Sequence, residues 1–375
     1  MSALGAPRVP TRMNALQISR FGGPEVLEQR EVPTPEIASD ELLIKVAFCG
    51  VCRHDLLTRA GAFPSIALPV ILGHQVSGYV ARVGREVEGF SLGQRVMTMI
   101  YTGCGWCSKC RAGNQALCLT ERPKFLGEDI DGGYAEYVKV RQDVALPVPD
   151  KVGLQEAAVI TCTLGTVYHA IVTQANVSSG DKVVITGASG GVGLHAIKVA
   201  KHLNARVIAI TSDPKKEPLV EAAGADDVLA SPDMKFARAV KSLTNSVGAD
   251  VTIEVVGATT LVESIRAVRN GGKVVVLGNV EGKAATVWPA HLILKEISLI
   301  GTKSCTRPEL DAVLSLVADG SVNVEVEGCV PLENGAEVHR RMEDGRSRGR
   351  LIIEVAGDKV VERPYTLGRD REKAE

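Results

Sequence analysis

The chain has 375 residues, of which 45% are hydrophobic and 23% charged, and its formal net charge is −1. This length and composition are ordinary for a globular protein with two domains. The small net charge and the 4% aromatic content offer neither a basic field nor a stacking platform for nucleic acid, and no apolar run approaches the roughly 18 residues of a membrane span.

The N-terminal sequence MSALGAPRVPTR has no apolar segment of the kind that a signal peptide needs. We therefore expect a cytoplasmic protein whose thiols stay reduced. The nine cysteines are an odd number, which also fits poorly with a complete disulfide framework. Residues 1–12 and 358–375 are polar or Pro-rich, and we expect both ends to be loose.

The sequence of the first 160 residues predicts short strands separated by Gly and Pro. The candidate strands cover residues 41–48, 76–84, 94–99 and 134–140. Short strands at regular spacing predict a β-barrel or a sandwich.

From about residue 180, strands alternate with helices. Strands are expected at 182–187, 206–211, 249–257, 272–278 and 297–302, with helices at 191–203 and 217–224 among them. This alternation predicts an α/β domain with a doubly wound parallel sheet. A helix at 308–320 follows, and a last strand at 349–357 is expected to rejoin the first domain.

The segment GCGWCSKCRAGNQALC (103–118) concentrates thiols in one loop. Its four cysteines are Cys104, Cys107, Cys110 and Cys118. The spacing C-x2-C-x2-C-x7-C is typical of a four-coordinate structural zinc site, which pins a lobe with little core of its own. Lys109 and Arg111 lie nearby to offset the net charge of such a centre. The alternative is a loop with four free cysteines.

The segment KVVITGASGGVGLHAI combines a buried strand, a glycine turn and a helix. The residues of the turn that we expect to contact a cofactor are Gly187, Gly190, Gly191, Val192 and Gly193. The spacing departs from G-x-G-x-x-G, because Ala188 follows the first glycine directly. Small residues before a helix N-terminus still allow a pyrophosphate to approach, so we expect dinucleotide binding. The alternative is a purely structural tight turn.

The end of the second strand selects the cofactor, because an acid there binds the ribose 2′-hydroxyl of NAD. This chain has Thr211 and Ser212, followed by Asp213, Lys215 and Lys216. Two hydroxyls and two lysines favour the phosphate of NADP. Asp213 is the argument for NAD.

A second metal site would need three protein ligands and an open position. Candidate ligands occur in three separate segments, which contain Cys49, Cys52, His54, Asp55, His74 and Cys162. Each has a simpler explanation, because cysteine is often a buried hydrophobe and a single histidine is often a packing residue.

Taken together, the motifs CGVCRHD, LGHQVSGYV, the four-cysteine loop, DGGYAEY, ITCTLGT, GASGGVG and ILKEISLIGT resemble the zinc-containing medium-chain dehydrogenase/reductase superfamily, alcohol dehydrogenase type. The resemblance covers about residues 14–356. It implies a GroES-like β-barrel catalytic domain at 1–162, to which 304–357 returns, and a Rossmann dinucleotide-binding domain at 163–303.

The resemblance also implies roles for particular residues. Cys52, His74 and Cys162 match the ligands of a catalytic zinc, which would be the second zinc of the chain. Asp55 matches the carboxylate that holds the free N–H of the histidine ligand. Arg53 matches a position that often meets the cofactor pyrophosphate.

Thr166 matches a position that touches the nicotinamide. Three positions depart from the family. Gln75 replaces the glutamate after the histidine ligand, His54 replaces the hydroxyl of the proton relay, and Leu57 replaces the relay histidine. His54 is therefore a candidate proton donor, with a water or a simple structural role as alternatives.

The resemblance implies an NAD(P)-dependent alcohol dehydrogenase or carbonyl reductase. Some segments are more similar to acryloyl-CoA reductase-like members, in which hydride goes to an activated alkene and the usual alkoxide relay is not required. A third possibility is a catalytically silent protein of the same fold. The expected partners are a small-molecule substrate and a second copy of the chain, in a homodimer or homotetramer joined at sheet edges.

Overall fold

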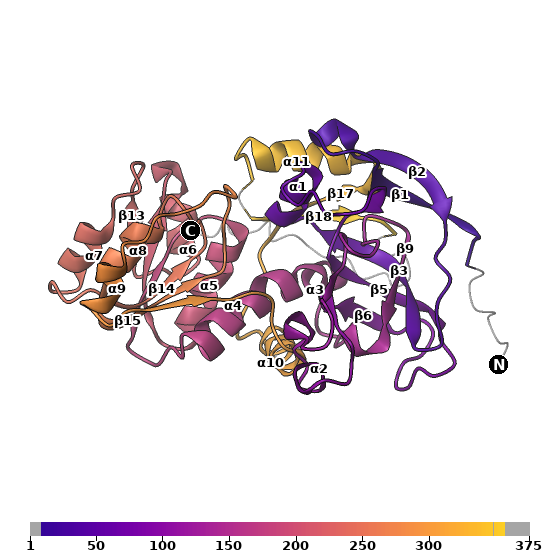
Figure 1. Cartoon of the computed structure of the whole chain (residues 1–375), viewed down its shortest axis with the longest axis horizontal. Helices are drawn as coiled ribbons and strands as arrows, with labels where there is room; N and C mark the ends of the chain where they lie inside the picture. The colour runs from indigo at the N-terminus through magenta and orange to yellow at the C-terminus, as the bar shows by residue number, and fades with distance from the viewer. Residues whose placement is uncertain (1–8, 348, 357–375) are drawn as a thin grey trace, which may run out of the picture.

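The computed structural model describes residues 9–347 and 349–356, which form two lobes joined by a helical segment (Figure 1). The lobe on the right of Figure 1 is built mainly of antiparallel strands, and the lobe on the left contains a parallel sheet. Residues 1–8 and 357–375, which make up most of the two ends expected to be loose, lie outside the described residues.

The main sheet of the β-rich lobe has the order β10-β6-β5-β3-β18-β17. β9 and β18 share one edge of β3, where β9 pairs with residues 41–45 and β18 with residues 48–50. The C-terminal strand expected at 349–357 therefore does pack into the first lobe. The strands of this sheet are β3 (Glu41–Gly50), β5 (Gln75–Val83), β6 (Arg95–Thr98), β9 (Tyr137–Arg141), β10 (Ala145–Pro147), β17 (Val326–Pro331) and β18 (Arg350–Glu354).

Two small sheets complete this lobe. Their strands are β1 (Arg12–Ile18), β2 (Glu28–Pro33) and β4 (Val70–Ile71) in one, and β7 (Tyr101–Thr102) and β8 (Lys124–Phe125) in the other. The strand expected at 134–140 starts only at residue 137, because the backbone N–H groups of residues 132–134 donate to carbonyls of residues 71–73 instead.

The six-stranded sheet of the other lobe has the order β13-β12-β11-β14-β15-β16, with every neighbouring pair parallel. This confirms the expected doubly wound sheet, whose order reverses between β11 and β14. The strands are β11 (Lys182–Ile185), β12 (Arg206–Thr211), β13 (Asp227–Ala230), β14 (Ala249–Glu254), β15 (Val268–Val276) and β16 (Ser298–Gly301).

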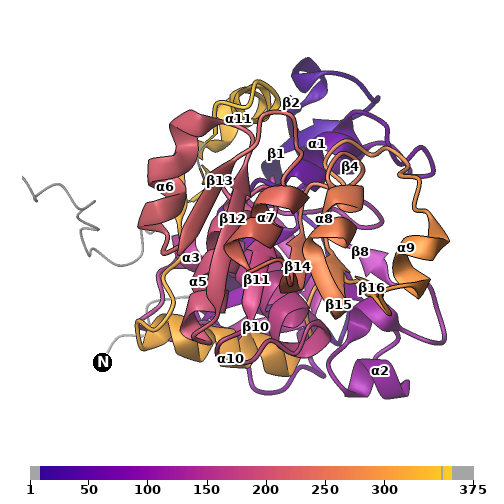
Figure 2. The ribbon, with the colours of Figure 1, turned by 90° about the vertical axis from the view of Figure 1, so that its left-hand side faces the viewer.

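Helices cover both faces of this sheet, so its strands are apolar on both sides. Val183 and Ile185 pack in the same core as Ile197 of α5, whereas Val184 packs with Val240 of α7 on the opposite face. Figure 2 shows the sheet with α7 and α8 in front. The helices of this lobe are α5 (Gly191–His202), α6 (Glu217–Ala222), α7 (Ala237–Leu243), α8 (Leu261–Ala267) and α9 (Pro289–Ile293).

A continuous helical segment at 154–174, which the sequence did not lead us to expect, joins the lobes. It consists of α3 (Leu154–Ile160), the π-helical turn η4 (Thr161–Gly165), α4 (Thr166–Tyr168) and the π-helical turn η5 (His169–Gln174). By length and composition it could cross a membrane, but 72% of its most apolar window is buried inside the protein. We therefore assign it to the core.

The remaining helices belong to the β-rich lobe or to its border with the parallel sheet. They are α1 (Arg53–Arg59), α2 (Ser108–Arg111), α10 (Arg307–Ala318) and α11 (Gly335–Glu343). α10 corresponds to the helix expected at 308–320. α11 and α1 lie side by side at the top of the view in Figure 1.

Candidate active site

Two thiols and one imidazole converge from three separate elements. Cys52 is the N-cap of α1, His74 immediately precedes β5, and Cys162 lies in η4. Their ligand atoms all lie within 4.8 Å of one another, and the Sγ atoms of Cys52 and Cys162 are 3.7 Å apart. The π-helical turn matters here, because its extra residue changes the direction in which the side chains at 161–165 project.

Asp55 fixes the geometry of two of these groups. Its Oδ1 lies 2.9 Å from Nδ1 of His74, and its Oδ2 accepts a hydrogen bond of 2.8 Å from the backbone N–H of Cys52. A third hydrogen bond, of 3.0 Å, comes from the hydroxyl of Tyr134. A carboxylate can only accept, so Nδ1 of His74 carries the proton and Nε2 is left for a ligand.

The electrostatics favour a thiolate at Cys52. The hydrogen bond from Cys162 lowers the pKa of Cys52 well below its usual range, against the effect of burial, and His74 and Arg350 lower it further. Burial alone would lower the pKa of His74, but Asp55 and, to a smaller extent, Cys52 outweigh it and raise this pKa to about 10. A metal that binds here would therefore displace a proton from the imidazole.

The donor set fits zinc. Two sulfurs and one imidazole nitrogen are ligands that zinc prefers, and the three residues also line one cavity. That cavity, of about 510 Å³, lies between the lobes. Three protein ligands facing a cavity leave a fourth position open to a substrate, which is the arrangement of a catalytic rather than a structural site.

The opposite wall of the cavity comes from the carboxyl ends of the parallel strands. It is formed by Val192, Val255, Leu277, Gly278 and Lys303, which follow β11, β14, β15 and β16. This is where doubly wound sheets bind their ligands. A larger cavity, of about 910 Å³, runs along β1 and β9, but it contains none of the candidate ligands.

The glycine turn has the backbone that its sequence suggests. Gly187 has a φ of +58°, a conformation that favours glycine. A Cβ atom at Gly193 would lie 2.3 Å from the carbonyl oxygen of Gly187, so the turn and the first turn of α5 are in close contact. Gly190, the N-cap of α5, has no side-chain cap, which leaves the first N–H groups of this helix for a ligand.

Arg350, which sequence reasoning missed, connects the glycine turn with the thiols. Its Nε atom is buried without a hydrogen-bond partner among the described residues and would lie 2.8 Å from a Cβ at Gly191. Its Nη1 donates a hydrogen bond of 3.4 Å to the carbonyl of Val51. An unpaired guanidinium N–H beside a glycine turn suits a phosphate.

The other residues expected to contact a cofactor lie around the same cavity or near the glycine turn. Arg53 lines the cavity and donates to the carbonyl of Met342 over 3.1 Å, and Thr166 lines the cavity as well. Thr211 is buried, and its Oγ1 lies 3.2 Å from Oγ of Ser189 in the glycine turn.

The polar side chains of the segment after β12 differ in exposure and in hydrogen bonding. Ser212 is exposed and Lys216 is partly exposed. Asp213 Oδ1 accepts a hydrogen bond of 3.0 Å from the backbone N–H of Lys215, so this carboxylate caps the next turn.

His54 also faces the cavity, in a setting that the sequence did not reveal. Its ring lies between Phe63 and Phe125, at centroid distances of 4.9 Å and 4.8 Å. Its Nε2 is 2.7 Å from Oε1 of Glu128, which also accepts a hydrogen bond from Thr58. Glu128 stands in the polar turn GEDIDGG, where nothing in the local pattern separates it from its acidic neighbours.

Leu57 and Gln75, two of the positions at which this chain departs from the family pattern, have different surroundings. Leu57 lines the cavity and places an apolar group where a relay histidine was expected. Gln75 is fully buried, and neither its Oε1 nor its Nε2 has a hydrogen-bond partner among the described residues.

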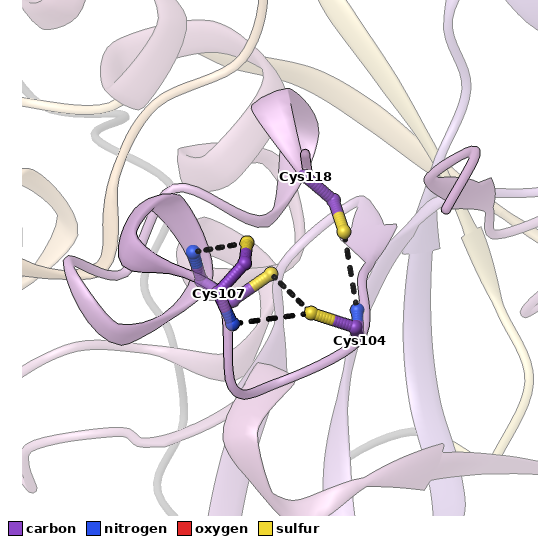
Figure 3. Close-up of side chains that lie close together, drawn as sticks. Cys104, Cys107 and Cys118 are labelled. Carbon is purple, nitrogen blue, oxygen red and sulfur yellow. Dashed lines mark hydrogen bonds between the residues drawn. The ribbon is translucent and has the colours of Figure 1, made fainter. Parts of the chain in front are cut away.

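The four-cysteine loop forms a second cluster. The side chains of Cys104, Cys107 and Cys118 lie close together (Figure 3), and the ligand atoms of all four cysteines fall within 4.8 Å of one another. Backbone N–H groups point at the sulfurs, with N–S distances of 3.3–3.5 Å. All nine cysteines of the chain are free, so no disulfide competes with a metal here.

The cysteine lobe has almost no other core. Apart from the four cysteines, no hydrophobic residue of the described chain belongs to this cluster. Arg141, from β9, donates to the carbonyls of Gly103 and Cys104 over 3.0 Å and 3.4 Å and ties the lobe to the barrel. A metal would supply the cross-link that apolar packing does not.

Comparisons with known proteins agree with this architecture. The family model described as "Alcohol dehydrogenase GroES-like domain" matches residues 38–150, and the one described as "Zinc-binding dehydrogenase" matches residues 191–319. These matches confirm the expected combination of a GroES-like domain with a Rossmann-type domain. The boundaries expected at residues 162 and 303 stay predictions.

Two curated relatives carry different activities in their names. The chain is 36% identical to an acryloyl-coenzyme A reductase of Metallosphaera sedula, over 87% of this chain and 96% of the relative. It is 33% identical to an alcohol dehydrogenase of Geobacillus stearothermophilus, over 92% of this chain and 100% of the relative. Among solved structures, the crystal structure of AibC is similar with a TM-score of 0.86 and 38% identity, over 92% of this chain and 96% of that one.

Proposed function

The chain belongs to the medium-chain dehydrogenase/reductase superfamily, of the alcohol dehydrogenase type, and on that premise we propose that it is a zinc-dependent enzyme that transfers hydride between NADP(H) and a carbonyl compound. One observation carries the proposal. Cys52, His74 and Cys162 meet at the wall of a cavity whose other wall is the carboxyl edge of the dinucleotide-type sheet. A hydride donor and an electrophile would therefore face each other there.

When bound, zinc would supply a Lewis acid that polarises a carbonyl oxygen, and the nicotinamide would supply the hydride. The residues of the chain would position these two groups and the substrate. Asp55 holds Nδ1 of His74, so that Nε2 is the nitrogen that would bind the metal, and the glycine turn with Arg350 would hold the pyrophosphate. Thr166 borders the space for the nicotinamide ring.

His54 is our proposed proton donor or acceptor for the substrate oxygen. It stands in the place of the usual relay hydroxyl, and Glu128 holds its Nε2. Its ring centroid lies 5.9 Å from that of His74, so it is close to the reacting groups without being a ligand.

The preference for NADP rests on the segment after β12. Asp213 is already engaged in capping its own turn, which weakens the argument that it binds a ribose hydroxyl. Ser212 and Lys216 remain accessible for a 2′-phosphate. We therefore propose NADP(H) as the cofactor.

Reduction of an activated alkene is the second candidate function. Leu57 and His54 replace the usual alkoxide relay, and a relative that matches over 87% of this chain is named an acryloyl-coenzyme A reductase. In this reaction the carbonyl would be the thioester next to the alkene, hydride would go to the β-carbon, and a proton from His54 or from water would go to the α-carbon.

A homo-oligomer joined through the edge strand β16 is also part of the proposal. β16 ends the parallel sheet, and Leu299 on it is exposed. Trp288, Ile293 and Leu294, in and around α9, are exposed as well. An apolar sheet edge of this kind favours pairing with a second copy.

One panel of assays tests these proposals. The zinc-loaded protein is given NADPH or NADH with simple aldehydes and ketones, and in parallel with enones and enoyl thioesters. Oxidation of NADPH by the carbonyl set supports the first proposal, and turnover of the alkene set alone supports the second. Two zinc ions per chain support an enzyme, whereas a single zinc ion whose removal changes no activity would support the catalytically silent alternative.

A further inference from the structure

The cavity beside the candidate metal ligands has an unusual charge. Its described lining contains three cationic side chains, Arg53, Lys303 and Arg350, and no aspartate or glutamate. The chain as a whole has a formal net charge of −1, so this excess is local. The thiolate favoured at Cys52 offsets part of this charge, but cationic side chains still outnumber anionic ones in the lining, and such a cleft concentrates negatively charged ligands.

The two arginines are accounted for by the cofactor. Arg350 lies against Gly191 in the glycine turn, and Arg53 enters the cavity from the first turn of α1. Lys303 is in a different place. It follows β16, which β14 and β15 separate from β11 and its glycine turn. Lys303 is therefore poorly placed to hold the pyrophosphate.

Lys303 sits on the aromatic side of the cavity. Its Nζ lies 4.7 Å from the ring centroid of Tyr101, a cation–π contact. The Tyr101 ring contacts Phe125 at 5.0 Å, and Phe125 contacts His74 at 4.9 Å. A row of rings thus leads from Lys303 to a candidate metal ligand.

The ammonium group has no anionic partner. Among the described residues, no carboxylate lies within ion-pair distance of Lys303, whose side chain is exposed at the mouth of the cavity. Partial desolvation of its side chain lowers the pKa of Lys303 only through the neighbouring protein atoms, and no neighbouring charge contributes to the change. The ammonium group therefore lines the cavity with no carboxylate to compete for it, and a negatively charged group of a ligand could form a charge-assisted hydrogen bond with it.

We propose that Lys303 determines substrate specificity by binding a negatively charged group of the substrate. This inference rests on the proposed function and narrows its substrate class to anionic carbonyl compounds or acyl thioesters. The negative group is either a carboxylate on the substrate itself or a phosphate of a carrier such as coenzyme A. The reacting carbonyl lies at the far end of the aromatic row, next to His74.

Calorimetry on the zinc-loaded, NADP⁺-loaded protein tests the proposal without turnover. Two matched pairs of probes differ only in their charged part: butyrate against butyramide, and S-butyryl-4′-phosphopantetheine against S-butyryl-pantetheine. We expect the wild type to bind the charged member of at least one pair about tenfold more tightly, the amount typical of a charge-assisted hydrogen bond. The first pair reports a carboxylate and the second a carrier phosphate.

Three variants assign that preference to the side chain. Lys303→Gln should lose it, and Lys303→Arg should retain most of it, because the charge is kept. Lys151→Gln is the control, since Lys151 is exposed and lines neither this cavity nor its neighbours. Circular dichroism and thermal midpoints confirm that each variant is folded.

Equal binding within both pairs, no binding of either charged probe, or a preference that survives in Lys303→Gln would each overturn the inference. These results are distinct from failure of the proposed function. A protein that reduces neutral carbonyls and charged ones equally keeps the function and loses the inference. A protein that binds anions through Lys303 but reduces no carbonyl or alkene keeps the inference and loses the proposed function.

Discussion

His74 and Asp55 form a buried pair, with Nδ1 and Oδ1 separated by 2.9 Å, and this contact decides which nitrogen of the imidazole is free. Asp55 is itself held by the N–H of Cys52 and the hydroxyl of Tyr134. The candidate ligands therefore do not depend on a metal to be brought together. The site is organised by hydrogen bonds that leave its metal-binding atoms facing one another.

Replacing Asp55 should weaken metal binding at this site. In Asp55→Asn the imidazole loses its charged partner, and we expect the affinity for zinc to fall by about 10- to 100-fold. Competition with a chromophoric chelator measures the affinity. Tyr134→Phe is the graded control, because it removes one hydrogen bond to Asp55 and leaves the His74 contact intact. An Asp55→Asn protein with wild-type affinity would contradict this role of the carboxylate.

The cysteine lobe should depend on its own zinc ion. Cys118→Ser removes one of four ligands, so we expect the zinc content to fall from two ions per chain to one, with a lower thermal midpoint and faster proteolysis of the lobe. Elemental analysis and limited proteolysis provide the readouts. Cys329→Ser is the matched control, because Cys329 belongs to neither cluster. Loss of zinc in the control, or none in Cys118→Ser, would refute the assignment.

Two glycines of the turn should respond differently to the same change. At Gly193 a Cβ would lie 2.3 Å from a backbone oxygen, so Gly193→Ala should cost about 1–3 kcal/mol of stability. At Gly190 the nearest atom is 3.4 Å away and the backbone is extended, so Gly190→Ala should fold normally. Its methyl group would instead face the cofactor and raise the Kd for NADPH several-fold. Thermal unfolding and fluorescence titration compare the two, and normal binding by a folded Gly190→Ala protein would argue against a pyrophosphate there.

His195 should make stability depend on pH. It donates from Nδ1 to the carbonyl of Gly191 over 2.5 Å, and its Nε2 accepts a bond of 3.0 Å from the N–H of Glu325. Burial lowers the pKa of His195 from 6.5 to about 4. The unfolded chain then binds more protons between these values, so the stabilisation present above pH 6.5 is lost as the pH falls towards 4.

Unfolding at several pH values checks this sign. The stability advantage of the wild type over His195→Gln should be largest near pH 7.5 and should shrink by up to roughly 3 kcal/mol by pH 4. His202→Gln is the control, because His202 on the same helix is exposed. An advantage that grows on acidification would show that the histidine is charged in the folded protein.

The parallel sheet was predictable because its signals are local. Each of its buried strands is a short apolar run, and β12 occupies the predicted residues 206–211. For other elements, the predicted and the observed ends differ by a few residues. For example, β14 ends at Glu254 rather than at the predicted residue 257. There the Glu254 carboxylate accepts hydrogen bonds from the N–H groups of Val256 and Gly257 and ends the strand.

The contacts around the candidate site were only partly predictable. The cysteine spacing is a local pattern, and the three catalytic ligands were identified by resemblance. Arg350 and Glu128 reach the site from elements far away in the chain, and a single arginine or glutamate carries no sequence signal of such a contact. The helical segment at 154–174 was missed because it is rich in β-branched residues such as Val159, Ile160 and Thr161, which have low helix propensity, and because Gly165 interrupts it.

Anomalous diffraction at the zinc edge, from crystals of the catalytically active protein, tests the central claim most directly. We predict two peaks per chain, one within the four-cysteine lobe and one between Cys52, His74 and Cys162. A single peak in the lobe, from protein that still oxidises NADPH with its substrate, would contradict the proposal that a metal at the second site drives the reaction.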